Sequence, residues 1–131
     1  MKKLKGYIFS RSFYDERVPQ HIQNKILRDY CNINGLEYLL SATEYTIKES
    51  SLMLKKLKKE MKGINGFIFY SIFQLPKNKE ERKNFYKKMI NSKKEINFPV
   101  EDMKLTKNSD IEVIEQILQI KEYLPNCLKS F

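Results

Sequence analysis

Short apolar runs alternate along the chain with segments whose apolar residues recur at helical spacing. The runs have the length of β-strands and cover residues 4–9, 37–42, 66–71 and 95–100. The third run, GFIFYS, is almost entirely apolar or aromatic, which is typical of a central strand buried on both faces. Because strands alternate with helices, the pattern predicts parallel strands joined by right-handed crossovers.

The helical segments are bordered by residues that commonly begin or end helices. The predicted starts are Val18-Pro19, Ser50 or Ser51, Asn78 with Glu81 as a capping box, and Asn108 or Ser109. The predicted ends are Asn34-Gly35, Gly63 and Pro125. The predicted core-facing residues are Ile22, Ile26, Leu27, Tyr30, Cys31, Leu54, Leu57, Met61, Phe85, Tyr86, Met89, Ile90, Ile111, Ile114, Ile117 and Leu118.

These elements predict an α/β fold over residues 1–131: a small single-domain parallel-sheet sandwich, with about four strands and helices on both faces. A chain of 131 residues suits one domain and can bury about two thirds of its surface. The core therefore needs no disulfide or metal to hold it together.

The apolar runs and the cysteines indicate the compartment. No run approaches the roughly 20 residues needed to cross a bilayer, and the basic N-terminus is not followed by the apolar region of a secretory signal. Cys31 and Cys127 fit a reducing compartment, and Cys31 falls on an apolar helix stripe, where an inert packed thiol is expected. We therefore expect a cytoplasmic protein with no membrane span.

The chain is basic, with a formal net charge of +9. Such a protein can attract nucleic acid, an anionic membrane or phosphorylated small molecules. The lysines, however, are scattered through helical segments such as KKLKKEMK, which is typical of solvated faces. The charge pattern therefore does not favour nucleic acid as the partner.

Polar side chains follow each predicted strand at the point where the strand ends. They are Ser10, Arg11 and Ser12 after the first strand, Ser41, Thr43, Glu44 and Tyr45 with the second, Ser71 and Gln74 after the third, and Glu101 and Asp102 after the fourth. In open α/β sheets, ligands bind beyond the carboxyl ends of the strands, where helix N-termini also offer N–H donors to anions. We expect these side chains to share that edge.

Arginine is rare in this chain, which has four arginines against 21 lysines. Two of the four, Arg11 and Arg17, lie close to the end of the first strand, and a third, Arg28, lies on the first helix near Asp29. A guanidinium grips a carboxylate or phosphate through two hydrogen bonds, which lysine cannot do. Arg11 and Arg17 are therefore either ligand-binding residues or partners of nearby acidic residues that fix the loops.

The same edge carries candidates for proton transfer and for ligand binding. The catalytic candidates are His21, which titrates near neutral pH, and the carboxylates of Glu44 and Glu101. The ligand-binding candidates are Ser10, Arg11, Ser12, Arg17, Gln20, Ser41, Tyr45, Ser71 and Gln74. Gln23, one turn after Gln20 at the start of a helix, could reach the same edge. Each has a structural alternative: the serines can cap loops, the tyrosine can pack at the rim, and the histidine can simply be exposed.

No cofactor is predicted. The four glycines are dispersed, so there is no glycine-rich phosphate loop, and no Cys and His residues have metal-ligand spacing. We therefore expect neither a nucleotide cofactor nor a metal centre.

Two segments, RDYCNINGLEYL and INGFIFYSIFQLPKN, resemble the catalytic domain of the serine recombinases (resolvases and invertases), over about residues 5–102. The resemblance implies a resolvase-like fold. In the loop after the third strand, Tyr70, Ser71 and Leu75 match the family pattern. Phe73, however, stands where the family has an aspartate.

Recombinase chemistry is not implied, because other family positions also differ. Gln74 and Lys77 replace two arginines that would stabilise a phosphoryl transition state. Aligned on Gly6-Tyr7, the family's nucleophilic serine falls on Arg11, and a one-residue slip is needed to place Ser10 there. The expectation is a resolvase-like fold without serine recombinase activity.

A second resemblance covers nearly the whole chain and rests on the strings GYIFSR, ERVPQHIQN, RDYC, YLLSATEY, FYSIFQLP and FPVED. They are similar to those of the sporadic carbohydrate cluster proteins, a family of short bacterial proteins. This resemblance implies that the protein acts in the biosynthesis of a cell-surface carbohydrate, such as the O-antigen of lipopolysaccharide or a capsular polysaccharide. It supplies no reaction.

Three hypotheses follow. The first is a small enzyme that binds an anionic sugar derivative, such as a nucleotide sugar or sugar phosphate, at the carboxyl ends of the strands. The second is a non-catalytic binding or regulatory module of the polysaccharide machinery, which includes assembly into a homo-oligomer. The third, less favoured, is a resolvase-like nucleic-acid-binding protein.

Overall fold

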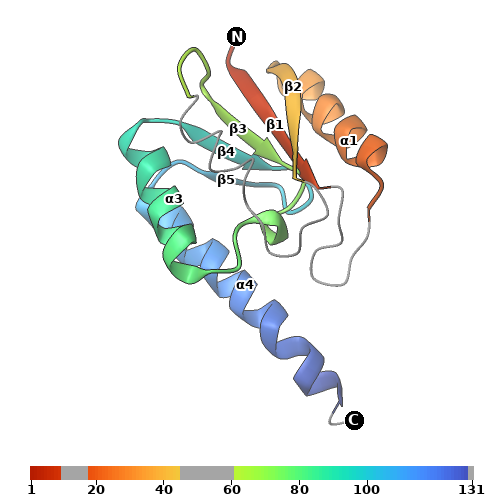
Figure 1. Cartoon of the computed structure of the whole chain (residues 1–131), viewed down its shortest axis with the longest axis vertical. Coiled ribbons are helices and arrows are strands. Elements are labelled where there is room, and N and C mark those ends of the chain that lie inside the picture. Colours follow the sequence, from red (N-terminus) through yellow and green to blue (C-terminus); the bar gives the residue numbers. More distant parts are fainter. Residues whose placement is uncertain (10–17, 45–60, 130–131) are drawn as a thin grey trace.

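The computed structural model describes residues 1–9, 18–44 and 61–129. Within these ranges, five strands form one sheet in the order β2-β1-β3-β4-β5 (Figure 1). The strands are β1 (Lys3–Phe9), β2 (Glu37–Glu44), β3 (Gly66–Phe69), β4 (Glu95–Phe98) and β5 (Met103–Leu105). The first four are mutually parallel where they pair, and β5 runs antiparallel to β4.

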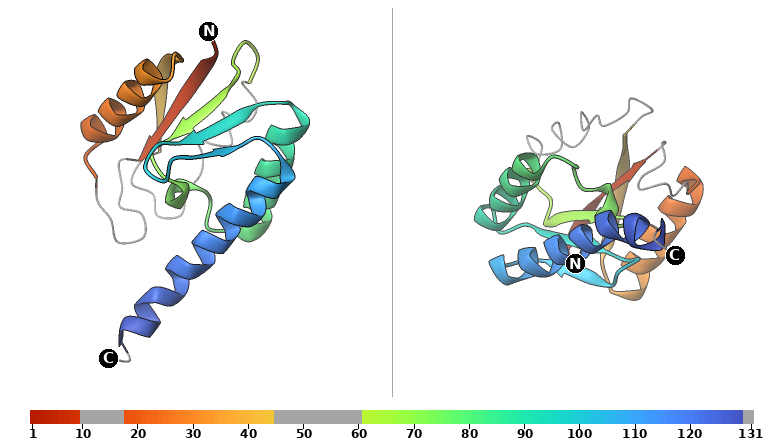
Figure 2. Two further views of the ribbon diagram at one scale, coloured as in Figure 1. Left: turned by 180° about the vertical axis from the view of Figure 1, so that it is seen from behind. Right: turned by 90° about the horizontal axis from the view of Figure 1, so that it is seen from below.

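Helices cover both faces of the sheet (Figures 1 and 2). The helical elements are α1 (Gln20–Ile33), the short 3₁₀ helix η1 (Ile72–Gln74), α3 (Lys79–Asn91) and α4 (Asn108–Lys129). On one face, α1 buries a small core that includes Leu4, Ile8 and Ile68. On the other face, α3 and α4 enclose a larger aromatic core, in which Tyr7 packs against Phe69 with ring centroids 4.6 Å apart.

The predicted α/β fold with helices on both faces is confirmed, and all four predicted strands are present. The expectation of about four strands was one too low, because β5 was missed. β5 has three residues, of which only Leu105 is buried, so it shows no apolar alternation along the sequence. It is positioned instead by its pairing with β4, where Ile96 lies opposite Leu105 and Phe98 opposite Met103.

The predicted end of the last helix at Pro125 was wrong. α4 begins at Asn108 as expected but continues through Pro125 to Lys129. Proline removes one helical N–H and crowds the preceding turn, which can bend a helix without ending it. The C-terminal half of α4 extends away from the sheet (Figure 1).

The buried stripe of α1 is shifted from its predicted position. Leu27 and Cys31 are buried as expected, but Ile22 is 37% exposed, and the third buried position belongs to Gln23. Residues 23, 27 and 31 are spaced by four and therefore lie on one face of the helix. Burial raises the pKa of the Cys31 thiol to about 11, which fits the predicted inert thiol.

The predicted second helix, which starts at Ser50 or Ser51, falls mostly outside the described residues. Its expected end is described: Gly63 has φ +84°, a left-handed conformation that favours glycine. The predicted cap of α3 is confirmed, because Asn78 Oδ1 accepts a hydrogen bond of 3.1 Å from the Glu81 N–H.

A buried ion pair joins α3 to α4. Arg82 Nε and Nη2 donate to the two carboxylate oxygens of Glu115 at 2.9 and 2.8 Å, and Tyr86 donates its hydroxyl to Glu115 at 2.8 Å. Arg82 Nη1 also donates to the carbonyls of Pro76 and Lys77. This fourth arginine therefore uses the bidentate geometry that lysine lacks.

The pair also sets the ionisation of its members. Burial would raise the pKa of Glu115, but hydrogen bonds from Arg82 and Tyr86, together with the charges of Arg82 and Lys79, outweigh it and hold that pKa below its usual range. Burial, followed by the bond to Glu115, raises the pKa of Tyr86.

We expect Glu115→Gln to lower the free energy of unfolding by about 2–3 kcal/mol at neutral pH, since it leaves a buried guanidinium without its charge partner. The pKa of Glu115 is lower in the folded chain than in the unfolded chain. Its contribution is therefore present at neutral pH and is lost as the pH falls through the carboxylate range. Urea unfolding at neutral and acid pH checks both points: the destabilisation caused by Glu115→Gln should shrink in acid. An equal effect at both pH values would contradict the assignment.

Candidate functional site at the carboxyl edge of the sheet

One buried side chain, Gln23, fixes the end of β1. Its Oε1 accepts a hydrogen bond of 3.0 Å from the Phe9 N–H, and its Nε2 donates to the Phe9 carbonyl at 2.8 Å and to the Val18 carbonyl at 2.7 Å. Gln23 is fully buried, so these bonds are made away from water. Phe9 and Val18 are the described residues on either side of segment 10–17, so a single amide ties both ends of that segment to the carboxyl end of β1.

A second buried amide extends this network to β3. Gln74 Nε2 donates to Gln23 Oε1 at 2.8 Å, and Gln74 Oε1 accepts from the Tyr70 N–H at 3.1 Å. Gln74 is 1% exposed and lies in η1, directly after β3. The exits of β1 and β3 and the start of α1 are therefore joined by two side chains.

A carboxylate joins the exit of β3 to the turn after β4. Glu101 accepts hydrogen bonds from the Ser71 hydroxyl at 2.7 Å and from the Ile72 N–H at 2.9 Å. Ser71 Oγ in turn accepts from the Phe73 N–H at 3.2 Å, which caps η1. The backbone adds a further link, because the Val100 N–H donates to the Tyr70 carbonyl at 3.3 Å.

The described part of the predicted edge is therefore held together by internal hydrogen bonds. The structure brings together Ser71 and Glu101 directly, and Gln74 with Gln23, all beyond the carboxyl ends of β1, β3 and β4. Glu101, a catalytic candidate, has both carboxylate oxygens engaged in these bonds. Its observed contacts are those of a residue that fixes the chain.

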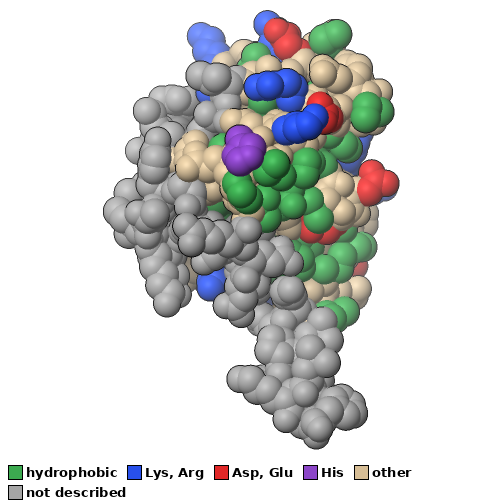
Figure 3. Space-filling model, turned by 90° about the vertical axis from the view of Figure 1, so that its right-hand side faces the viewer, with side chains coloured by type: hydrophobic (Ala, Val, Ile, Leu, Met, Phe, Trp, Pro, Cys, Tyr) green, Lys and Arg blue, Asp and Glu red, His purple; other side chains and the backbone are tan. Residues whose placement is uncertain are grey.

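Two candidates on the first turn of α1, Gln20 and His21, are exposed. Figure 3 shows the one histidine at the surface, beside a group of apolar side chains. His21 has no carboxylate or hydroxyl partner among the described residues, which distinguishes it from a histidine oriented for proton transfer.

The remaining candidates cannot be placed as side chains. Ser10, Arg11, Ser12, Arg17 and Tyr45 lie outside the described residues. Ser41 and Glu44 lie on β2, and of these two residues only the backbone is described. Within the described side chains, no group of three or more His, Cys, Asp or Glu is arranged to hold a metal ion.

Sequence analysis named Gln23 with Gln20 as residues that could reach this edge, but it did not predict that Gln23 is buried there. The signal available was position: Gln23 is four residues before Leu27 and eight before Cys31, so a polar residue interrupts the buried stripe of an otherwise amphipathic helix. A buried polar residue at such a position has to find partners, and strand ends supply unpaired backbone groups.

Comparison with known proteins identifies the fold. No family model matches the chain, and no curated protein matches it. The structure is similar to the crystal structure of the N-terminal catalytic domain of TP901-1 integrase, with a TM-score of 0.64 and 15% sequence identity, over 94% of this chain and 98% of that chain. The fold is resolvase-like. At this identity the likeness shows the fold alone, and none of the comparisons supports the resemblance to the carbohydrate cluster proteins.

Within the described ranges, none of the helices combines the length and the apolar character that crossing a membrane requires.

We expect Gln23→Leu to destabilise the chain by about 2–3 kcal/mol, because it keeps the side-chain volume but removes the hydrogen bonds to the Phe9 N–H, the Phe9 carbonyl and the Val18 carbonyl. Gln20→Leu, three residues earlier and exposed, is the matched control and should change stability by less than about 0.5 kcal/mol. Denaturant unfolding of the two variants measures the difference. Similar stabilities would mean that the Gln23 network contributes little.

Proposed function

We propose that the carboxyl edge of the sheet binds an anionic sugar derivative, such as a sugar phosphate or nucleotide sugar, and that the protein acts in bacterial cell-surface carbohydrate biosynthesis. The observation that carries the proposal is the Gln23 clamp, which ties both ends of the segment bearing Arg11 and Arg17 to the end of β1. Arg11 follows Phe9 by two residues, so its backbone is within about 7 Å of that strand end.

Three features support an anion as the ligand. The chain carries a net charge of +9, which attracts anions over its whole surface. The start of α1 borders the same edge and adds N–H donors. The Gln23 bonds also hold Phe9 and Val18, the residues that flank the segment bearing Arg11 and Arg17, and such anchoring lowers the entropy lost when a segment binds a ligand. The nature of the sugar rests on the sequence strings alone.

Binding is better supported than turnover. Ser71, Gln74 and Glu101 all satisfy their hydrogen bonds within the protein, so they build the floor of the edge. If the protein is an enzyme, proton transfer falls to Glu44 or to His21, and His21 is exposed on the first turn of α1. If it is a regulatory module, the same edge binds the ligand without changing it.

A resolvase-like nucleic-acid-binding protein is the second candidate, because the fold is that of an integrase catalytic domain and the chain is basic. Against it, Gln74, which replaces a family arginine, is buried in the glutamine network rather than facing a substrate. Retention on DNA that falls steeply with added salt would favour this candidate.

We expect sugar phosphates or nucleotide sugars to raise the melting temperature, and Arg11→Lys to reduce that shift, since lysine keeps the charge but loses the bidentate grip. Lys25→Gln, on the exposed side of α1, is the control and should leave the shift unchanged. A shift that Arg11→Lys does not alter would remove Arg11 from the site. No shift with any sugar derivative, together with retention on DNA, would replace the proposal by the second candidate.

Mass spectrometry of the bound compounds after incubation separates the two forms of the proposal. An altered compound indicates an enzyme. A recovered, unaltered compound indicates the binding module.

A further inference from the structure

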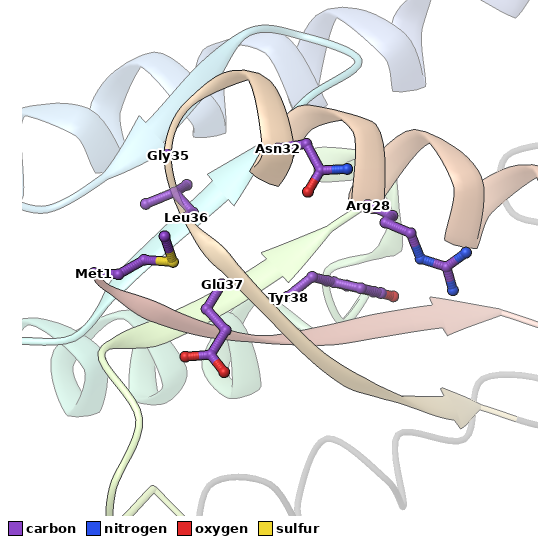
Figure 4. A pocket seen from close by; sticks show the side chains of 7 residues that line it. All are labelled: Met1, Arg28, Asn32, Gly35, Leu36, Glu37 and Tyr38. Carbon is purple, nitrogen blue, oxygen red and sulfur yellow. The ribbon is translucent and has the colours of Figure 1, made fainter.

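A pocket of about 360 Å³ lies between α1 and the beginning of β2, at the opposite end of the strands from the carboxyl edge (Figure 4). Its lining residues are Met1, Arg28, Asn32, Gly35, Leu36, Glu37 and Tyr38. Glu37 is the first residue of β2, and its N–H donates to the Lys2 carbonyl just before β1. The pocket is therefore separate from the edge to which the proposed function is assigned.

Arg28, the arginine of this pocket, has no hydrogen-bond or ion-pair partner among the side chains that the structure describes. Asp29, the adjacent acidic residue, is paired with Lys25 at 3.1 Å rather than with Arg28. Across the described ranges, the Arg28 guanidinium makes no hydrogen bond or ion pair, whereas Arg82 has a bidentate carboxylate partner. In a chain with four arginines and 21 lysines, an arginine without an internal partner that lines a pocket is suited to an external oxyanion.

The rest of the pocket is pre-formed. Tyr38 is half-buried, and its hydroxyl donates to Asn24 Oδ1 at 2.5 Å, which fixes the position of the ring. Leu36 is half-buried against the α1 core and adds apolar surface. Asn32 lies one helical turn after Arg28 on the same face of α1, so its amide is directed to the same opening.

We propose that this pocket binds a small molecule that carries an oxyanion attached to a flat apolar body. Arg28 would take the oxyanion, Asn32 an additional polar atom, and Tyr38 with Leu36 the apolar body. The volume is that of a small-ligand site, in which a few convergent polar groups orient a mostly apolar ligand. Glu37 at the other end of the pocket disfavours a second negative group there, so the site selects ligands with one anionic end.

Three probes test this with the full chain: benzoate, phenyl phosphate and uncharged benzyl alcohol. In amide NMR titrations, we expect benzoate or phenyl phosphate to shift the signals of residues 28–38 and to leave those of Ser71 and Gln74 unchanged. Benzyl alcohol should produce no saturable shift. The stronger of the two anions tells whether the site prefers a carboxylate or a phosphate.

Arg28→Gln should weaken the binding of the preferred anion about tenfold or more, and Arg28→Lys by less, because a lysine keeps the charge without the fork. Lys87→Gln, at an exposed position of α3 and outside the pocket lining, is the control for loss of one positive charge and should leave the affinity unchanged. Equal affinity for Arg28→Gln and wild type would overturn the proposal. Three further outcomes would also overturn it. They are signal shifts confined to the carboxyl edge, shifts of residues 28–38 that depend only on protein concentration, and the absence of saturable binding of either anion.

This test is independent of the proposed function. The melting-temperature shift with sugar phosphates depends on Arg11 and the NMR titration on Arg28, so either result can fail without the other.

Discussion

The carboxyl edge depends on the amide of Gln23. β1 lies between β2 and β3, and its last residue, Phe9, pairs with Glu44 of β2 but lies beyond the last residue paired with β3. Gln23 supplies both a donor and an acceptor to Phe9 and adds a bond to Val18, so α1 and β1 are locked where the chain leaves the sheet. Gln74 accepts a hydrogen bond from the Tyr70 N–H just after β3 and donates one to Gln23 Oε1, the same oxygen that accepts from the Phe9 N–H. Both amides are buried and hydrogen-bonded to each other. Removing either one would therefore leave the other buried with one hydrogen bond unmade.

Two sets of buried side-chain contacts hold helices in place, and they differ in charge: the Gln23–Gln74 network is neutral, and the Arg82–Glu115 pair is ionic. Neutral amides hold the α1 side, where no charge needs to be desolvated. A charged pair, Arg82 with Glu115, holds the α3–α4 side, and Tyr86 satisfies a remaining lone pair of the carboxylate. The scarcity of arginine in the sequence was thus an indicator of geometry-dependent contacts, and Arg82 shows that such a contact can be internal. The same reasoning makes Arg28, which lacks an internal partner in the described structure, the more informative arginine.

The sequence was a good guide to elements and a weaker guide to contacts. Periodicity identified the strands, α1, the capped start of α3 and the start of α4, because buried faces leave a regular apolar pattern. It failed for β5, which is too short for a pattern, and at Pro125, where proline was treated as an absolute end. At the site, the strand exits drew attention to Ser71, Gln74 and Glu101, which the structure joins to their neighbours by hydrogen bonds. These bonds could not be predicted, since they join residues up to 51 positions apart. Gln23 was expected near the same edge, but its burial was not, because a polar residue is unusual on a buried stripe.

The short antiparallel β5 has a consequence for solubility. At the β5 edge of the sheet, a strand from another molecule could pair with only three residues. One of them is Lys104, whose ammonium group would lose its hydrating water on close approach. Long, flat and uncharged edge strands are the templates on which further chains pair side by side and build fibres. An edge strand this short that carries a positive charge offers few backbone groups for another chain to pair with. The β5 side of the molecule is therefore protected from edge-to-edge aggregation.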